Sequence, residues 1–169
     1  VDVRLVATTN RDLRSEADVI LDTSGLNVHQ LHAKVSLLLD ATVGSRVRLA
    51  VMSFGFKYGV PLDADFVMDM RFLPNPFWVP ELRAKAGTDP AVADYVLGQA
   101  GATAFLDRAM ALFEPVLEGY LREGRRYVTL AIGCTGGKHR SVAITEALAA
   151  RFDPERVVAF VVHRDLGRE

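Results

Sequence analysis

The residues with the clearest chemistry form a glycine-rich, basic stretch at positions 133–141, which reads Gly-Cys-Thr-Gly-Gly-Lys-His-Arg-Ser. An apolar run before it predicts a strand, and the pattern after it predicts a helix. A glycine loop there directs backbone N–H groups and the positive end of the helix dipole towards one point, where anions bind. Lys138, His139 and Arg140 add side-chain donors, and Ser141 can cap the helix or bind an oxygen. We predict a phosphate site; the alternative is that the glycines only permit a tight turn.

Two kinds of phosphate chemistry can be compared with this loop. It is not a standard triphosphate loop, because Lys138 is followed by His139 and position 132 is not glycine. The spacing from Cys134 to Arg140 is that of cysteine-dependent phosphatases, in which a thiolate of lowered pKa attacks phosphorus. Such an enzyme also needs a general acid, for which Asp69 or Asp165 is available. In the simpler alternative, Cys134 is a small residue that donates only its backbone.

Composition limits the classes of protein that fit. The chain has 169 residues, half of them hydrophobic, and can bury the core of one domain. The net charge is −1, but residues 122–169 carry 9 Lys and Arg against 6 Asp and Glu, so a polyanion surface is expected in the last third. A single cysteine fits a reducing cytosol, and neither a membrane span nor a signal peptide is visible. His29 and His32 share a helix face, but two histidines without a third ligand predict no metal site.

Periodicity predicts the elements that position the loop. We predict helices over 27–40, 89–97, 103–122 and 139–152, and strands over 47–54, 66–72, 127–132 and 157–162. Pro115 should kink the third helix, and three prolines should exclude regular structure over 74–80. Apolar strands alternating with helices predict an α/β fold with an open, mostly parallel sheet, helices on both faces and the glycine loop between a strand and a helix.

Polar residues follow several of these strands. Lys57 follows the first strand, Asp69, Arg71 and Asn75 lie at the end of the second, and His163 begins a polar triplet after the last. If the strands are parallel, all of these residues lie at the edge that carries the glycine loop, where open α/β sheets bind ligands. Each residue alone also has an ordinary explanation in a turn or a solvent-exposed ion pair.

Basic residues near the end of the chain are candidate contacts for nucleic-acid phosphates, although most charged residues are simply solvated. The candidates are Arg122, Arg125, Arg126, Lys138, Arg140, Arg151, Arg156, Arg164 and Arg168. Phe56, Tyr58, Phe77 and Trp78 could stack on unpaired bases, although aromatic residues more often belong to a core.

Three ordered motifs carry a family resemblance: residues 53–59 (Ser-Phe-Gly-Phe-Lys-Tyr-Gly), residues 63–76 from Asp-Ala-Asp to Arg-Phe-Leu-Pro-Asn-Pro, and residues 133–141 with the closing His163-Arg164. Together they resemble the C-terminal domain of the RNase adapter protein RapZ family, also called the YvcJ family of nucleotide-binding proteins. The resemblance implies that residues 1–26 are a tether from an N-terminal P-loop domain that binds ATP or GTP. Residues 27–169 are then a C-terminal domain for metabolite and RNA binding.

The resemblance also implies a cytoplasmic adapter that senses glucosamine-6-phosphate or a nucleotide sugar. Such an adapter binds small regulatory RNA and works with a ribonuclease or other protein partner. A homo-oligomer is compatible with this role. No cofactor and no reaction are implied for this domain, and any NTPase activity belongs to the P-loop domain. The implied ligand contacts are Cys134, Thr135, Gly136, Gly137, Lys138, His139, Arg140, Ser141, Lys57, Arg71 and Asn75. The RNA contacts that we infer are Tyr58, Arg125, Arg126, His163, Arg164 and Arg168. Tyr58 stands where enterobacterial members commonly have histidine, and the basic tail of those members is absent, so RNA binding is less supported than anion binding.

Overall fold

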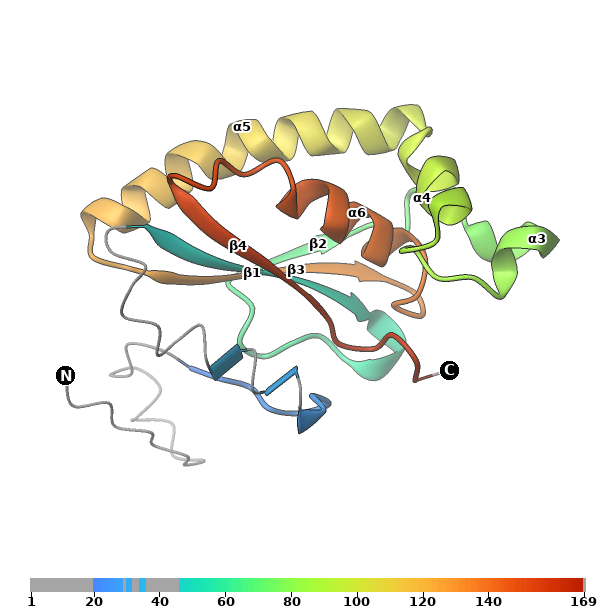
Figure 1. The fold of residues 1–169 in the computed structure, drawn as a ribbon, viewed down its shortest axis with the longest axis horizontal. Helices are drawn as coiled ribbons and strands as arrows, with labels where there is room; N and C mark the ends of the chain where they lie inside the picture. Colours follow the sequence, from blue (N-terminus) through green and yellow to red (C-terminus); the bar gives the residue numbers. More distant parts are fainter. Residues whose placement is uncertain (1–19, 29, 32–33, 36–45, 169) are drawn as a thin grey trace.

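The computed structural model describes residues 20–28, 30–31, 34–35 and 46–168, so most of the predicted tether, together with His29 and His32, lies outside the described residues. The elements in chain order are β1 (Val47–Gly55), the 3₁₀ turn η2 (Phe56–Tyr58), β2 (Phe66–Asp69), the 3₁₀ turn η3 (Pro76–Trp78), α3 (Pro80–Arg83), α4 (Pro90–Leu97), α5 (Ala100–Arg122), β3 (Tyr127–Cys134), α6 (Arg140–Ala149) and β4 (Val157–His163). Figure 1 shows the long helix α5 and the shorter α6 above a twisted sheet.

The four strands form one parallel sheet in the order β2-β3-β1-β4. The central strand β1 is buried along its whole length, as its almost continuous apolar sequence predicts for a parallel sheet covered on both faces. The predicted α/β fold with a parallel sheet is therefore confirmed. Because the strands are parallel, their carboxyl ends meet at one edge, with Gly55 beside Cys134 and Asp69 beside Gly133.

The two faces of the sheet have different coverings. On one face, Leu49 and Val51 of β1 belong to the same apolar core as Ile144 and Leu148 of α6. Complete burial of one such side chain stabilises the fold by about 1.5–3 kcal/mol. On the opposite face lie the described helical residues between positions 28 and 35, drawn in blue in Figure 1. These residues fall within the helix predicted over 27–40.

Besides shifts of one to three residues at other element ends, two features differ from the sequence prediction. Strand β2 ends at Asp69, three residues early, because the Asp69 side chain accepts the backbone N–H of Arg71 at 2.9 Å in a tight turn. The proline-rich stretch is not irregular, because the first positions of η3 and α3 are prolines, which a helix tolerates there. Helix α5 runs through Pro115 without interruption; Pro115 lies on its exposed side, where water can satisfy the carbonyl that loses its N–H partner.

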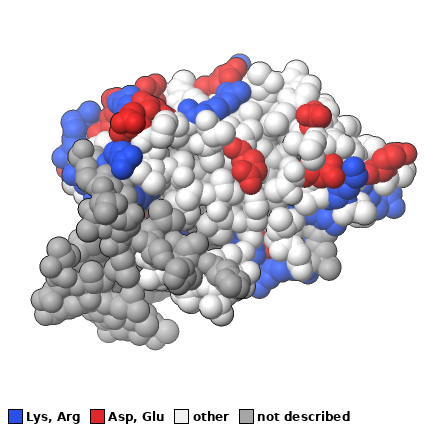
Figure 2. All heavy atoms as spheres, in the orientation of Figure 1, with Lys and Arg blue, Asp and Glu red and all other residues white. Residues whose placement is uncertain are grey.

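Charge on the surface is mixed in sign. Figure 2 shows acidic and basic side chains interspersed on the face that it displays. Arg156 pairs with Glu114 and Glu118, and Arg151 pairs with Asp107. Helix α5 therefore supplies the counter-charges for these two arginines, which lie between α6 and β4. None of the described helices has the length and apolar character required to cross a membrane.

Candidate functional site

The glycine loop joins β3 to α6 and packs against the turn that follows β1. Gly137 has φ +78°, a left-handed conformation that favours glycine. A Cβ on Gly55 would lie 2.6 Å from the carbonyl carbon of Gly136, so the two backbones are in direct contact. The backbone N–H of Lys57 donates to the carbonyl of Thr135 at 3.2 Å. The motifs around residues 55 and 135 therefore meet in space, as the parallel strands require.

The thiol of Cys134 lies inside this loop rather than on its surface. Its Sγ is 3.1 Å from Ser141 Oγ and accepts the backbone N–H of Gly137 at 3.3 Å. Cys134 is 3% exposed and Ser141 is fully buried. Ser141 thus contacts the sulfur, and α6 begins without a side-chain cap after His139. Backbone N–H groups in the first turn of a helix have no partner within the helix, which suits an anion.

Arg140 is a buried cation, only 4% exposed, at the first position of α6. Its Nη1 donates to the carbonyls of Arg71 at 3.2 Å and Leu73 at 3.0 Å. Its Nη2 donates to Thr135 Oγ1 at 3.3 Å, and its buried Nε has no hydrogen-bond partner in the described part of the chain. Among the described residues no carboxylate lies within salt-bridge distance of this guanidinium. In the described part of the chain this guanidinium therefore has no directly paired carboxylate, and Asp69 interacts with it only at longer range.

Asp69 and Arg71 form an exposed pair at the end of β2. Arg71 Nη2 lies 2.7 Å from Asp69 Oδ2, and each side chain is nearly half exposed. The pKa of Asp69 is lowered, chiefly by the hydrogen bonds from Arg71, and burial opposes the shift only in part. The Arg71 guanidinium also lies 4.1 Å from the ring centre of Phe56, the residue before Lys57. Asn75 accepts the backbone N–H of Phe77 as the cap of η3.

The two other basic residues of the loop face different surroundings. Lys138 is half-buried, and its carbonyl accepts the backbone N–H of Gly87 at 2.8 Å. His139 is buried, and its Nε2 lies 3.1 Å from the carbonyl of Arg83. A Cβ on Gly87 would lie 2.3 Å from the carbonyl oxygen of His139, so the segment after α3 packs tightly on the start of α6. His139 therefore contacts this segment.

The predicted RNA contacts do not form one surface. Arg125 pairs with Asp65, and Arg126 accepts a backbone bond from the start of β1; both lie where β3 begins, away from the glycine loop. The other predicted RNA contacts lie at the glycine-loop edge and interact with residues of the protein itself. Arg164 and Arg168 pair with Asp165, Tyr58 donates to the carbonyl of Arg168, and His163 lies between Ser53 and Glu146. The structure thus places the predicted RNA contacts at both ends of the sheet, and the polyanion surface stays a prediction.

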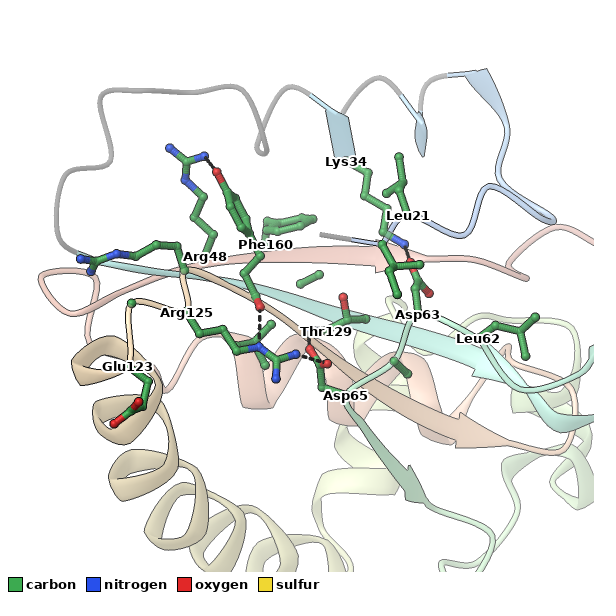
Figure 3. A pocket seen from close by; sticks show the side chains of 17 residues that line it. Leu21, Lys34, Arg48, Leu62, Asp63, Asp65, Glu123, Arg125, Thr129 and Phe160 are labelled. Carbon is green, nitrogen blue, oxygen red and sulfur yellow. Dashed lines mark hydrogen bonds and ion pairs between the residues drawn. The ribbon is translucent and has the colours of Figure 1, made fainter. Parts of the chain in front are cut away.

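A hollow of about 640 Å³ lies on the sheet face opposite α6, at the amino-terminal end of the strands (Figure 3). Ala50 and Phe160 contribute to its lining, and an Arg125–Asp65 ion pair and a Lys34–Asp63 ion pair border it. The side chain of Asp63 is 2% exposed, and its Oδ1 has no hydrogen-bond partner among the described residues. The sequence predicted no pocket here, although it named Arg125 and Arg126, which line the hollow, as RNA contacts, and residues 63–65 belong to one of the family motifs.

The fold and the glycine-loop edge together define an open α/β domain with a glycine loop between β3 and α6. Residues 47–167 match the family of RapZ C-terminal domains, and the chain belongs to this family. It is 58% identical over 159 residues to a protein of Streptomyces coelicolor named nucleotide-binding protein, with 94% of this chain aligned to 53% of that protein. A Parafrankia protein of the same name is 56% identical over 174 residues, covering 99% and 60% of the two chains. A Saccharopolyspora erythraea relative is 59% identical over 158 residues, covering 93% and 54%. The chain thus spans about half the length of the curated relatives that it matches.

Proposed function

We propose that the glycine-loop edge binds the phosphate group of a small molecule, and that the domain senses this ligand without transforming it. The observation that carries the proposal is the buried Arg140 guanidinium, which has no carboxylate partner among the described residues and an unpaired Nε. Burying an unpaired charge costs several kcal/mol, and a bound anion offsets that cost. The loop amides at the start of α6 and Lys57 support the same anion.

The ligand class follows from the family as well as the edge. The relatives of this chain are named nucleotide-binding proteins, which supports a small-molecule ligand. We propose a phosphorylated sugar similar to glucosamine-6-phosphate, or a nucleotide sugar, contacted by Thr135, Gly136, Arg140, Lys57 and Arg71. We propose that ATP or GTP binding belongs to the part of these relatives that does not align with this chain. Regulatory RNA and a ribonuclease partner stay predictions from the resemblance, as does a cytoplasmic location.

Calorimetric titration tests the proposal with three probes: glucosamine-6-phosphate, a uridine diphosphate sugar and inorganic phosphate. We expect heat with at least one of them, and a loss of that heat in Arg140→Ala. The matched control is Arg151→Ala, which removes an exposed arginine paired with Asp107 and should bind normally. Thermal unfolding of both variants verifies that Arg140→Ala is folded. No heat from the wild-type protein with any probe at millimolar concentration would refute the proposal.

A cysteine-dependent phosphatase is the second candidate, favoured by the contacts of the Cys134 thiol with Ser141 Oγ and the Gly137 N–H. In such an enzyme the cysteine sulfur is the attacking atom. The acid partner is less suited, because the pKa of both Asp69 and Asp165 is lowered, which disfavours proton donation near neutral pH. An aryl-phosphate assay decides: turnover that disappears in Cys134→Ser supports the enzyme, and turnover equal to wild type excludes the thiolate.

A further inference from the structure

The carboxylate of Asp165 is fully buried immediately after β4 and is surrounded by donors. One oxygen accepts the backbone N–H of Gly55 at 2.8 Å. Arg164 Nη2 and Arg168 Nη1 each lie 2.8 Å from a carboxylate oxygen. We call Asp165, Arg164 and Arg168 the carboxylate clamp. Donors from three residues surround this buried carboxylate and make its position well defined, because each charge-assisted hydrogen bond restricts it.

The clamp lies directly behind the glycine loop. A Cβ on Gly137 would lie 2.7 Å from the backbone nitrogen of Gly55 and 3.1 Å from the Cβ of Asp165. The same backbone nitrogen of Gly55 donates to Asp165. The carboxylate therefore fixes the point at which the turn after β1 touches the glycine loop.

The two arginines of the clamp hold the other end of that turn. Arg164 Nη2 donates to the carbonyl of Gly59 at 2.6 Å. The guanidinium of Arg168 lies 5.4 Å from the ring centre of Tyr58, and the Tyr58 hydroxyl donates to the Arg168 carbonyl at 2.9 Å. Lys57 lies between these two anchored ends, and its backbone N–H donates to Thr135. The clamp thus restrains both ends of the turn that carries Lys57.

We propose that Asp165 is a positioning residue for the anion site: it places the Lys57 turn against the glycine loop, without contacting the ligand. The inference rests on the proposed function, because it assumes that this edge binds phosphate. A binding constellation depends on supporting residues that hold its parts in place. Electrostatics alone predicts the opposite effect of Asp165, because a negative charge close to an anion site weakens binding. The sign of the effect therefore separates positioning from charge.

Titration of the full chain with inorganic phosphate tests this inference in Asp165→Asn and Asp165→Glu. Positioning predicts weaker binding in both variants, by about tenfold, the lower range for loss of a supporting partner. Charge alone predicts tighter binding in Asp165→Asn and no change in Asp165→Glu. Asp107→Asn is the matched control, since it removes an exposed carboxylate distant in sequence from the loop and should leave affinity unchanged.

A double-mutant cycle with Lys57→Ala distinguishes positioning from a general loss of stability. If Asp165 acts through the Lys57 turn, Asp165→Asn should weaken binding much less when Lys57 is already replaced. Fully additive losses, or tighter binding in Asp165→Asn, would overturn the inference. If neither Asp165 variant folds, Arg168→Met, which removes one donor from the clamp, serves in the same cycle.

Amide hydrogen exchange separates a failure of this inference from a failure of the proposed function. If wild-type protein binds none of the three calorimetric probes, the proposed function fails. Exchange at residues 55–59 and 135–137 then decides the clamp alone: faster exchange in Asp165→Asn supports its hold on the loop, and unchanged exchange refutes it.

Discussion

Replacement of Gly137 by alanine tests the packing of the glycine loop most directly. Gly137 has φ +78°, and an added Cβ would lie 2.7 Å from the backbone nitrogen of Gly55 and 3.0 Å from the carbonyl carbon of Phe54. These neighbours belong to β1, a strand that is buried over its whole length. The substitution therefore adds both a strained backbone conformation and a steric clash that no side chain can relieve.

The expected cost has two parts. A left-handed conformation costs a residue with a Cβ about 1–2 kcal/mol. Overpacking a close-packed region adds about 1–3 kcal/mol, and the smaller conformational entropy of the unfolded chain returns about 0.4–1 kcal/mol. Gly137→Ala should therefore destabilise the protein by about 1–5 kcal/mol, and each kcal/mol lowers Tm by about 2–4 °C in a chain of this size.

Gly124→Ala is the matched control, because Gly124 has φ +80° but an added Cβ would meet no atom within 4 Å. It should cost only the strain, about 1 kcal/mol. Urea unfolding followed by circular dichroism gives both free energies. We also expect weaker phosphate binding in Gly137→Ala, since the loop must move away from β1. An equal loss of stability in the two variants would show that Gly137 is not in contact with β1 and would refute the reasoning.

Three further predictions concern acid stability, helix packing and RNA. Burial raises the pKa of Asp165, but hydrogen bonds from Arg164, Gly55 and Arg168 outweigh it, and the pKa in the folded protein is lowered from 3.8. The ionised carboxylate therefore stabilises the fold above pH 3.8, and this contribution is lost as the pH falls through the pKa of the folded protein. Below pH 4, the stability of Asp165→Asn should fall less steeply than that of wild type, and equal slopes in an acid titration would contradict this. Gly87→Ala should lower Tm because its Cβ would lie 2.3 Å from the His139 carbonyl oxygen; an unchanged Tm would argue against that contact. In gel shifts at rising salt, Arg125→Ala should not change RNA affinity, because Asp65 already pairs with that guanidinium; a reduced salt dependence would show a phosphate contact instead.

The sequence alone was sufficient for the four strands, for helices α4, α5 and α6 and for their order along the chain, but not for the short elements η2, η3 and α3. Apolar runs such as 127–132 and 157–162 are local signals, because a strand buried on both faces requires apolar residues at every position. The glycines at 133, 136 and 137 are equally local, since they permit close backbone approach. Parallel pairing then follows from the alternation of strands and helices, and it places the ends of β1, β2, β3 and β4 at one edge.

Two predictions from local signals were wrong, and in both the missed signal was the turn chemistry of nearby residues. The end of β2 moved to Asp69 because that side chain bonds the backbone of Arg71, and the prolines of 74–80 began short helical turns rather than preventing them. Composition also suggested a basic surface in the last third of the chain. Counter-charges from α5, 42 and 38 residues away from Arg156, neutralise part of it, and no local pattern announces such pairs.

The tertiary structure alone decided what the site residues contact. Arg140 is fixed by carbonyls 69 and 67 residues away and keeps an unpaired Nε in the described part of the chain, whereas Asp165 binds Gly55, 110 residues away. These partners meet because β1 lies between β3 and β4, with β2 beyond β3, and that strand order is set by packing of the whole sheet. The sequence determined which residues gather at the glycine-loop edge; only the fold decided which charge is left for a ligand and which is used to hold the loop.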